Sequence, residues 1–305
     1  MIAKRLEKGD TIGLVSPAGP ENPEKIKESI KVFESLGFKI KKGKHIYDKL
    51  GYLAGTDNDR AEDLMNMFLD KDIDMILCVR GGYGSMRILP LIDFDIIKKN
   101  PKIFAGFSDI TTLLNSIVQK CQLTTFHSPM CNSNFYDEPT IKSFLDTLML
   151  GYKPFIIKNP KRIATIGIDK THAIGQLVGG NLSLICSTLG TPFEIDTNDK
   201  ILFIEEVGEQ PYKIDRMLTQ LLLSEKLQKC AGIILGQFTN CRLPHYERSL
   251  TLQEVIEDRI LSLGIPVLTN IQSGHSYPKL TLPIGARVKI NCKKRVIEVL
   301  EAVVE

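Results

Sequence analysis

The chain has 305 residues, with 39 Lys or Arg against 36 Asp or Glu, and its formal net charge is +3. This length suits one large or two medium domains with a substantial hydrophobic core. Because the charges nearly balance and form no basic stripe, we expect no nucleic-acid partner. No apolar run reaches the roughly 18 residues of a membrane span.

Seven cysteines are scattered through the chain, an odd number without a CxxC pair. This pattern favours reduced thiols in a cytosolic protein over a disulfide framework. We expect no metal site, because the chain has neither an HExxH motif nor a close Cys/His pair. The first ten residues lack the long apolar core and the cleavage site of a signal peptide, so the expected location is cytoplasmic.

The first half of the chain alternates buried strands with helices. We expect strands at 11–16, 39–43, 74–79 and 103–107, and helices at 23–36, 60–69, 85–92 and 110–120. In the first helix the apolar residues recur with the helical period, and Gly37 is suited to end it. Strands separated by helices predict βαβ units and a parallel sheet.

Residues 150–170 contain linker-like Gly, Pro and Lys segments, so we predict two domains at 1–155 and 170–305. The second half mixes both kinds of element. We expect strands at 200–205, 232–236 and 288–290, and helices at 182–189 and 212–223.

Ser108 lies at a sharp junction between a strand that ends in Gly106 and a helix. A serine at such a turn exposes its Oγ at the carboxyl edge of the sheet, beside the free N–H groups that open the helix. This geometry suits a nucleophile whose oxyanion intermediate needs backbone donors. Ile110 replaces the second glycine of the usual motif, and helix capping by Ser108 or Asp109 is the simpler alternative.

The run from Arg80 to Gly84 follows another buried strand, at the edge where parallel sheets bind ligands. Its glycines allow a backbone N–H to approach a substrate oxygen closely. A tight turn that needs positive φ explains them equally well. The run is neither a P-loop nor a dinucleotide fingerprint, because it lacks GK[ST] and GxGxxG.

Glu205 directly follows the apolar residues 201–204, where a carboxylate is held firmly enough to orient a histidine. Solvated turn acids are the alternative for Glu205, Glu206 and Glu209.

His275 follows a glycine in a predicted loop, and its ordinary pKa suits a general base near neutral pH. A lone loop histidine is more often simply exposed. Of the other histidines, His45, His172 and His245 are weaker candidates, and His127 is a rival that could line a pocket. Ser108, Glu205 and His275 have the chain order of one kind of catalytic triad, but triads are recognised by geometry.

The chain resembles the LD-carboxypeptidases, serine peptidases that include muramoyl-tetrapeptide carboxypeptidase and the microcin C immunity peptidases. The matching motifs occur in the family's order over nearly the whole chain. They lie at residues 9–19, 80–84, 106–112, 126–130, 179–182, 189–192, 204–209, 212–218, 274–275 and 282–285.

The resemblance implies that Ser108 is the nucleophile, His275 its base and Glu205 the residue that orients His275. Where members of the family often carry Asp after this glutamate, the chain has Glu206, and Glu205 remains in register. The resemblance also implies an oxyanion hole of backbone N–H groups near Gly82 and Asp109.

The fold implied by the resemblance is α/β. It has an N-terminal flavodoxin-like parallel sheet with helices, a C-terminal β-rich mixed α/β domain, and the site in the cleft between them. The resemblance further implies a homodimer without a cofactor. Arg80 is the candidate to bind the terminal carboxylate of a substrate, and a structural role in the turn is its alternative.

The expected reaction is removal of a terminal D-Ala from the murein tetrapeptide during peptidoglycan recycling, at the bond that follows an L-centre. One alternative is an immunity-type peptidase that cleaves an aminoacyl- or peptidyl-nucleotide. Such a substrate would favour an aromatic platform for the base, and the chain has no Trp. Another alternative is a non-catalytic protein that binds a small ligand on the same fold.

Overall fold

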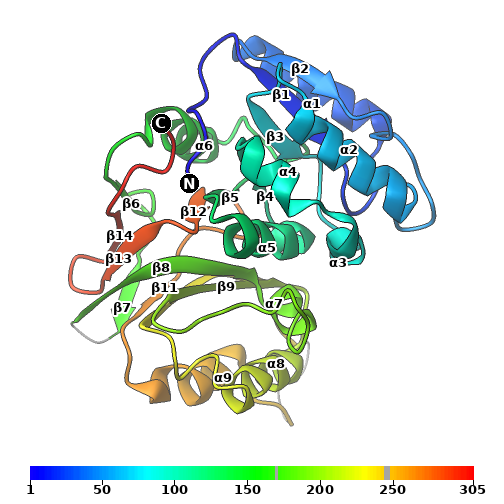
Figure 1. The fold of residues 1–305 in the computed structure, drawn as a ribbon. Coiled ribbons are helices and arrows are strands. Elements are labelled where there is room, and N and C mark those ends of the chain that lie inside the picture. The colour runs from blue at the N-terminus through cyan, green and yellow to red at the C-terminus, as the bar shows by residue number, and fades with distance from the viewer. Residues whose placement is uncertain (169–170, 244–247) are drawn as a thin grey trace. The chain divides into compact units, whose positions relative to one another are not determined.

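The computed structural model describes residues 1–168, 171–243 and 248–305. The chain divides into two compact units, and neither is continuous in sequence. The first comprises Met1–Lys153, Thr281–Gly285 and Ala302–Glu305, and the second comprises Pro154–Leu280 and Ala286–Glu301. Each unit contains a β-sheet with helices, so the fold is mixed α/β, as predicted (Figure 1).

The first unit is built on a six-stranded sheet with the order β12-β5-β4-β3-β1-β2. Five strands are parallel in the flavodoxin-like order 2-1-3-4-5, and β12 pairs antiparallel with β5. The prediction of a flavodoxin-like parallel sheet is confirmed. The strands are β1 (Thr11–Val15), β2 (Lys39–Lys42), β3 (Met75–Cys78), β4 (Ile103–Gly106), β5 (Thr125–His127) and β12 (Leu282–Ile284).

Helices connect the strands of the first unit. They are α1 (Pro23–Ser35), α2 (Asp57–Leu69), α3 (Ser85–Ile88), η1 (Leu89–Leu91), α4 (Phe94–Lys99), η2 (Ser108–Ile110), α5 (Thr111–Cys121) and α6 (Glu138–Leu150). A reciprocal capping box between Thr56 and Asp59 starts α2. Gly37, with a φ of +94°, follows the end of α1. Phe68 of α2 packs on Phe104 of β4 with 6.1 Å between ring centroids, which joins this helix to the core.

The second unit is built on an eight-stranded mixed sheet with the order β6-β14-β13-β8-β9-β10-β11-β7. Strands β8 to β11 are parallel, and the flanking strands pair antiparallel. The strands are β6 (Phe155–Ile157), β7 (Ile166–Ile168), β8 (His172–Asn181), β9 (Ile201–Val207), β10 (Gly232–Thr239), β11 (Val267–Thr269), β13 (Arg287–Asn291) and β14 (Val296–Val299).

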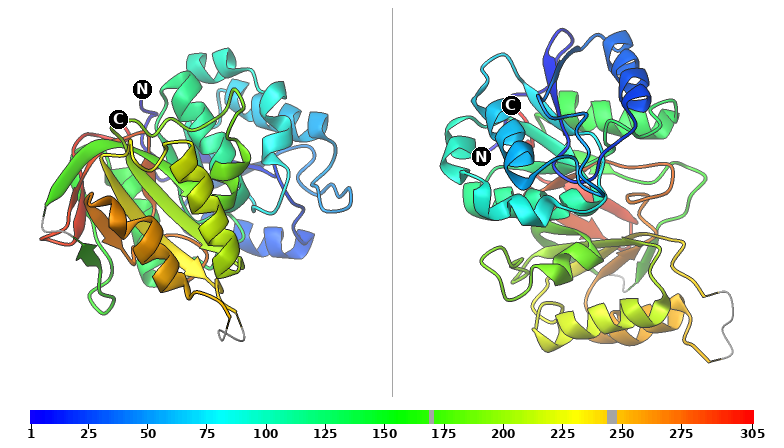
Figure 2. Two further views of the ribbon diagram at one scale, coloured as in Figure 1. Left: turned by 90° about the horizontal axis from the view of Figure 1, so that it is seen from below. Right: turned by 90° about the vertical axis from the view of Figure 1, so that its right-hand side faces the viewer.

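The helices of the second unit are α7 (Leu182–Ser187), α8 (Pro211–Leu223), α9 (Leu252–Arg259) and η3 (Leu261–Leu263). Figure 2 shows α8 and α9 side by side along this sheet. Ile214 and Leu218 of α8 belong to one buried cluster with Leu202 and Ile204 of β9. These apolar contacts fix the strand that carries Glu205.

Three expectations from the sequence need correction. The linker-like segment carries β6 and β7, the edge strands of the second sheet, so this unit begins before residue 170. The first unit also includes two segments from far along the chain, because β12 completes its sheet and Val304 bridges to Ala3. Strand β9 continues to Val207, so Glu205 lies within the strand, opposite Asn181 of β8.

Among the helices in the described ranges, none has the length and apolar character that a membrane span requires.

Candidate active site

Ser108 has a φ of 64°, in the left-handed region that disfavours residues other than glycine. One residue separates it from the end of β4, and it begins η2, which leads into α5. Phe107 and Ile110 occupy the cap positions of η2 and α5, so helix capping by Ser108 or Asp109 is not what the structure shows. Strain of this kind is typical of a nucleophile held at a strand-to-helix turn.

The glycine run after β3 lies against Ser108. A Cβ atom added to Gly81 would lie 2.8 Å from Cβ of Ser108 and 3.3 Å from the backbone nitrogen of Asp109. Close approach therefore requires the glycine at 81. Gly82, in contrast, has a φ of +121°, so at this position the backbone turn accounts for the glycine. The turn reading of the run therefore holds at Gly82, and the approach of a backbone N–H to a substrate oxygen stays a prediction.

The side chain of Asp109 ties the serine turn to the glycine run. Its Oδ2 accepts a bond of 2.7 Å from the backbone N–H of Ser85, and its carbonyl accepts one of 2.5 Å from Oγ of Ser85. Burial raises the pKa of the Asp109 carboxyl, and the bonds from Ser85 oppose this rise. The carboxylate is thus structural, while the backbone N–H of Asp109 belongs to the opening of the helix.

Arg60 is a supporting residue that the sequence analysis did not identify. Its guanidinium is buried, and Nη1 donates to the carbonyls of Pro17 (2.5 Å) and Gly84 (2.8 Å). It also pairs with Asp57. These bonds hold the loop after β1 and the end of the glycine run together. A single arginine in an amphipathic helix gives no sequence signal for this role.

Arg80 contacts backbone carbonyls. Its Nε donates to Gly81 and its Nη1 to Pro20, each over 3.2 Å. The alternative role of Arg80, holding the turn through backbone carbonyls, requires bonds of this kind. The role of Arg80 in binding a substrate stays a prediction.

Glu205 and His275 form a bonded pair in the second unit. Nδ1 of His275 lies 2.7 Å from Oε2 of Glu205, whose side chain is completely buried. Because a carboxylate only accepts hydrogen bonds, Nδ1 carries the proton, and in the neutral ring Nε2 is left as the acceptor. This tautomer is the one that a general base needs.

The neighbouring glutamates are engaged elsewhere. Glu206 accepts bonds from the backbone N–H and Oγ of Ser183, at 2.8 and 2.7 Å, and from Nδ2 of Asn181 at 3.0 Å. It therefore anchors the start of α7. Glu209 forms an ion pair with Lys213 over 3.0 Å. None of the three glutamates is the freely solvated turn acid of the alternative reading.

His127, the rival histidine, is buried at the end of β5. Its ring packs edge-on against Phe107 with 5.7 Å between centroids, and β12 pairs beside it through Leu282. Its place is in the core of the sheet next to the serine turn. His245 lies outside the described residues.

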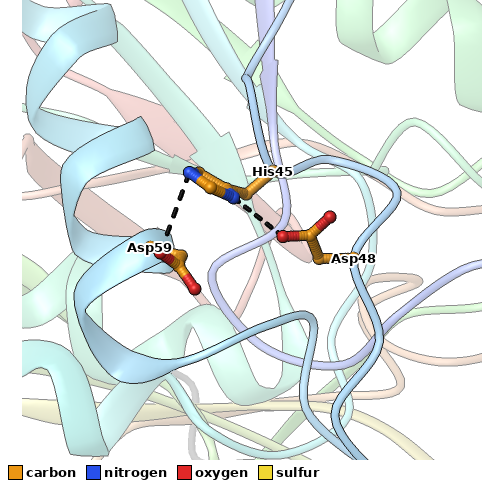
Figure 3. A group of neighbouring side chains, drawn as sticks. All are labelled: His45, Asp48 and Asp59. Atoms are coloured by element: carbon orange, nitrogen blue, oxygen red, sulfur yellow. Dashed lines mark hydrogen bonds and ion pairs between the residues drawn. The ribbon is translucent and has the colours of Figure 1, made fainter.

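Within the described residues, His45, Asp48 and Asp59 form a group with metal-ligand chemistry (Figure 3). Nδ1 of His45 bonds to Asp48 over 2.7 Å, while Nε2 faces Asp59 at 3.8 Å. In the capping box, Oδ2 of Asp59 accepts bonds from the backbone N–H and Oγ1 of Thr56, and its Oδ1 is the oxygen that faces His45. The hydrogen bond that His45 donates to Asp48 raises the pKa of His45, so the structure shows a histidine paired with a carboxylate.

Both halves of the chain match models of one peptidase family. Residues 12–128 match the LD-carboxypeptidase N-terminal domain, and residues 174–290 match the LD-carboxypeptidase C-terminal domain. The chain belongs to the LD-carboxypeptidase family, and the resemblance seen in the sequence is confirmed.

Individual relatives agree with this membership. A probable murein peptide carboxypeptidase of Bacillus subtilis (strain 168) is 44% identical over 96% of this chain and 92% of its own. The microcin C7 self-immunity protein MccF of Escherichia coli is 29% identical over 99% of this chain and 96% of its own.

Solved structures give the same picture. Wild-type MccF in the apo state superposes with a TM-score of 0.91 at 27% identity, over 100% of both chains. A muramoyltetrapeptide carboxypeptidase from Oxalobacter formigenes does so with a TM-score of 0.81 at 27% identity, over 95% of this chain and 97% of its own.

Proposed function

We propose that this protein is a serine carboxypeptidase that releases the terminal D-Ala of murein tetrapeptides. The left-handed backbone of Ser108, pressed against Gly81, is the observation that carries the proposal. A strained serine at the carboxyl end of a parallel strand serves no evident structural purpose, whereas it suits a nucleophile. The murein-directed names of relatives that span nearly the whole chain support the substrate class.

In the proposed mechanism, Nε2 of His275 takes the proton from Oγ of Ser108 as that oxygen attacks the scissile carbonyl. Glu205 keeps the proton on Nδ1 and stabilises the imidazolium that forms. Backbone N–H groups near Gly82 and Asp109 stabilise the oxyanion. The imidazolium then protonates the leaving amine of D-Ala, and a water activated by His275 hydrolyses the acyl-enzyme.

Incubation with two substrates tests the proposal. One is a tetrapeptide in which D-Ala follows meso-diaminopimelate or lysine, and the other is an aminoacyl-sulfamoyl-adenylate. Mass spectrometry should detect free D-Ala and the tripeptide from the first substrate. Cleavage of the nucleotide conjugate alone would favour the immunity-type activity, which the relationship to MccF keeps as the second candidate.

The non-catalytic alternative makes a different prediction. A fluorophosphonate probe should label wild-type protein at Ser108 and leave the Ser108→Ala variant unlabelled. A wild-type protein that binds the tetrapeptide without reacting with the probe or cleaving the peptide would favour a ligand-binding role.

A role in murein recycling also implies a cytoplasmic protein, and we propose that it acts there as a homodimer. Light scattering coupled to gel filtration measures the assembly, and cell fractionation measures the location. A mass near 34.2 kDa, that of one chain, would contradict the dimer.

A further inference from the structure

Lys279 is a buried lysine in the loop that carries His275. Only 6% of its surface is exposed, which is unusual for a lysine. Its Nζ donates a hydrogen bond of 2.9 Å to the carbonyl of Gly274, the residue before His275. The ammonium group also lies 5.0 Å from the ring centroid of Tyr277, so it contacts the loop both before and after His275.

The charge of this lysine is attracted to the buried carboxylate of the pair. Glu205 has no exposed surface, and within the described residues its Oε1 has no hydrogen-bond partner. A buried carboxylate in this condition needs a compensating positive charge. Burial lowers the pKa of Lys279 to about 8, and attraction to Glu205 opposes the shift.

Three other titratable groups near Glu205 do not supply that charge. His275 is neutral when it acts as a base, and the Cys241 thiol is uncharged because burial raises its pKa to about 11. Glu206 is itself an anion. Because side chains alternate between the two faces of a strand, the side chains of Glu205 and Glu206 also leave β9 on opposite faces. Within the described residues, Lys279 is a buried cation that is attracted to Glu205.

We propose that Lys279 is a positioning residue for the general base: its ammonium group fixes the Gly274 carbonyl beside His275 and balances the charge of Glu205. This inference rests on the proposed function, since it assigns His275 as the base. The proposal has an electrostatic consequence. Without the cation, Glu205 would favour the imidazolium more strongly, and His275 would hold its proton to a higher pH.

Gln237 of β10 offers a neutral comparison, because it also bonds to the loop that carries His275. Its backbone N–H donates to Ser273 over 3.0 Å, its Oε1 accepts from the N–H of Ser276 over 2.8 Å, and its Nε2 donates to Pro278 over 3.1 Å. Gln237 thus holds the loop without a charge. Its removal should loosen the loop without the electrostatic effect.

The test measures the titration of His275 by NMR of the imidazole in a Ser108→Ala background. We expect Lys279→Met and Lys279→Gln to raise the midpoint by about half a unit to one unit, and Lys279→Arg to restore it. Gln237→Ala and the exposed control Lys294→Met should leave the midpoint unchanged. In enzymes with Ser108 intact, the acid limb of kcat/KM should move in parallel, because the base must be neutral.

Lys279→Gln keeps a hydrogen-bond donor and covers the case in which Lys279→Met fails to fold. An unchanged midpoint in a folded Lys279→Gln variant, or the same shift in Gln237→Ala, would overturn the inference. A wild-type protein without carboxypeptidase activity would instead overturn the proposed function, because the NMR titration needs no turnover.

Discussion

Nδ1 of His275 donates to Oε2 of Glu205 over 2.7 Å, although the two residues lie 70 positions apart in the chain. The bond links a loop to the interior of strand β9, whose apolar residues anchor the carboxylate. A carboxylate that is fixed on one side and completely buried can orient an imidazole at little entropic cost at the moment of reaction.

Replacing Glu205 should therefore affect catalysis far more than replacing Glu206. Glu205→Gln loses the charge that stabilises the imidazolium and favours the wrong tautomer, so kcat should fall by about a thousandfold or more. Glu206→Gln should lower the free energy of unfolding by about 1 to 3 kcal/mol, because charge-assisted bonds to Ser183 and Asn181 weaken. Steady-state kinetics and urea unfolding of both variants measure the two effects. The reverse ranking in kcat would place the orienting role on Glu206.

Ser108→Ala should retain the fold and lose at least about a thousandfold in turnover, as expected for a triad serine. Ser108→Gly should be equally inactive and should also raise the Tm, because glycine removes the strain of a φ of 64°. Circular dichroism and kinetics on both variants provide the measurements. Turnover near the wild-type level in Ser108→Ala would contradict the proposed nucleophile.

Gly81→Ala should impair catalysis through a steric effect on the serine. The added methyl would meet Cβ of Ser108 at 2.8 Å, so the serine turn must shift. A displacement of about one ångström is enough to lower kcat by about a hundredfold. Labelling by a fluorophosphonate probe should slow as well. Wild-type labelling kinetics in a folded variant would show that the turn tolerates the methyl and that close approach is unimportant.

The role of Arg80 can be separated with a modified substrate. Amidation of the substrate's C-terminus should abolish most cleavage if the enzyme binds the terminal carboxylate. Arg80→Lys should then raise KM for the free acid, since lysine lacks the bidentate fork, and leave residual activity on the amide little changed. Equal losses on both substrates would instead assign Arg80 to its bonds with the carbonyls of Gly81 and Pro20.

The His45 pair should make stability depend on pH. The hydrogen bond that His45 donates to Asp48 raises the pKa of His45 above its usual 6.5. Its contribution is therefore fully present below about pH 6.5 and is lost as pH rises through the folded-state pKa. Urea unfolding of His45→Gln against wild type should show a larger loss of stability at pH 5.5 than at pH 8.5. Asp48→Asn should show the same trend, and losses independent of pH in both variants would refute this account.

The sequence predicted the first sheet well because its signals are local. Strands β1 to β4 are apolar runs between helices with clear caps, such as Thr56 and Asp59 on α2. Strand β12 has only three residues and pairs with a strand from much earlier in the chain, so no local pattern indicates it. Strands β6 and β7 were hidden in a segment rich in linker residues, because edge strands tolerate such composition.

The site shows a similar division between local and distant signals. The positions of Ser108 and Glu205 next to apolar strands singled them out, and the Gly before His275 marked its loop. Arg60 and Lys279 escaped notice because charged residues are expected at the surface. Their burial depends on carbonyls of Pro17, Gly84 and Gly274 that only the fold brings near.

The interrupted course of the chain has a consequence for biosynthesis. The first unit contains the N-terminal 153 residues but also needs Thr281–Gly285 and Ala302–Glu305. While the protein is being made, β5 remains an open edge until β12 leaves the ribosome, and Val304, the partner of Ala3, emerges later still. A nascent chain would thus expose an unpaired strand until β12 has been made, and so would a chain truncated before β12. Because each unit is made of separate chain segments, neither can be replaced by the matching unit of a relative in a single continuous stretch.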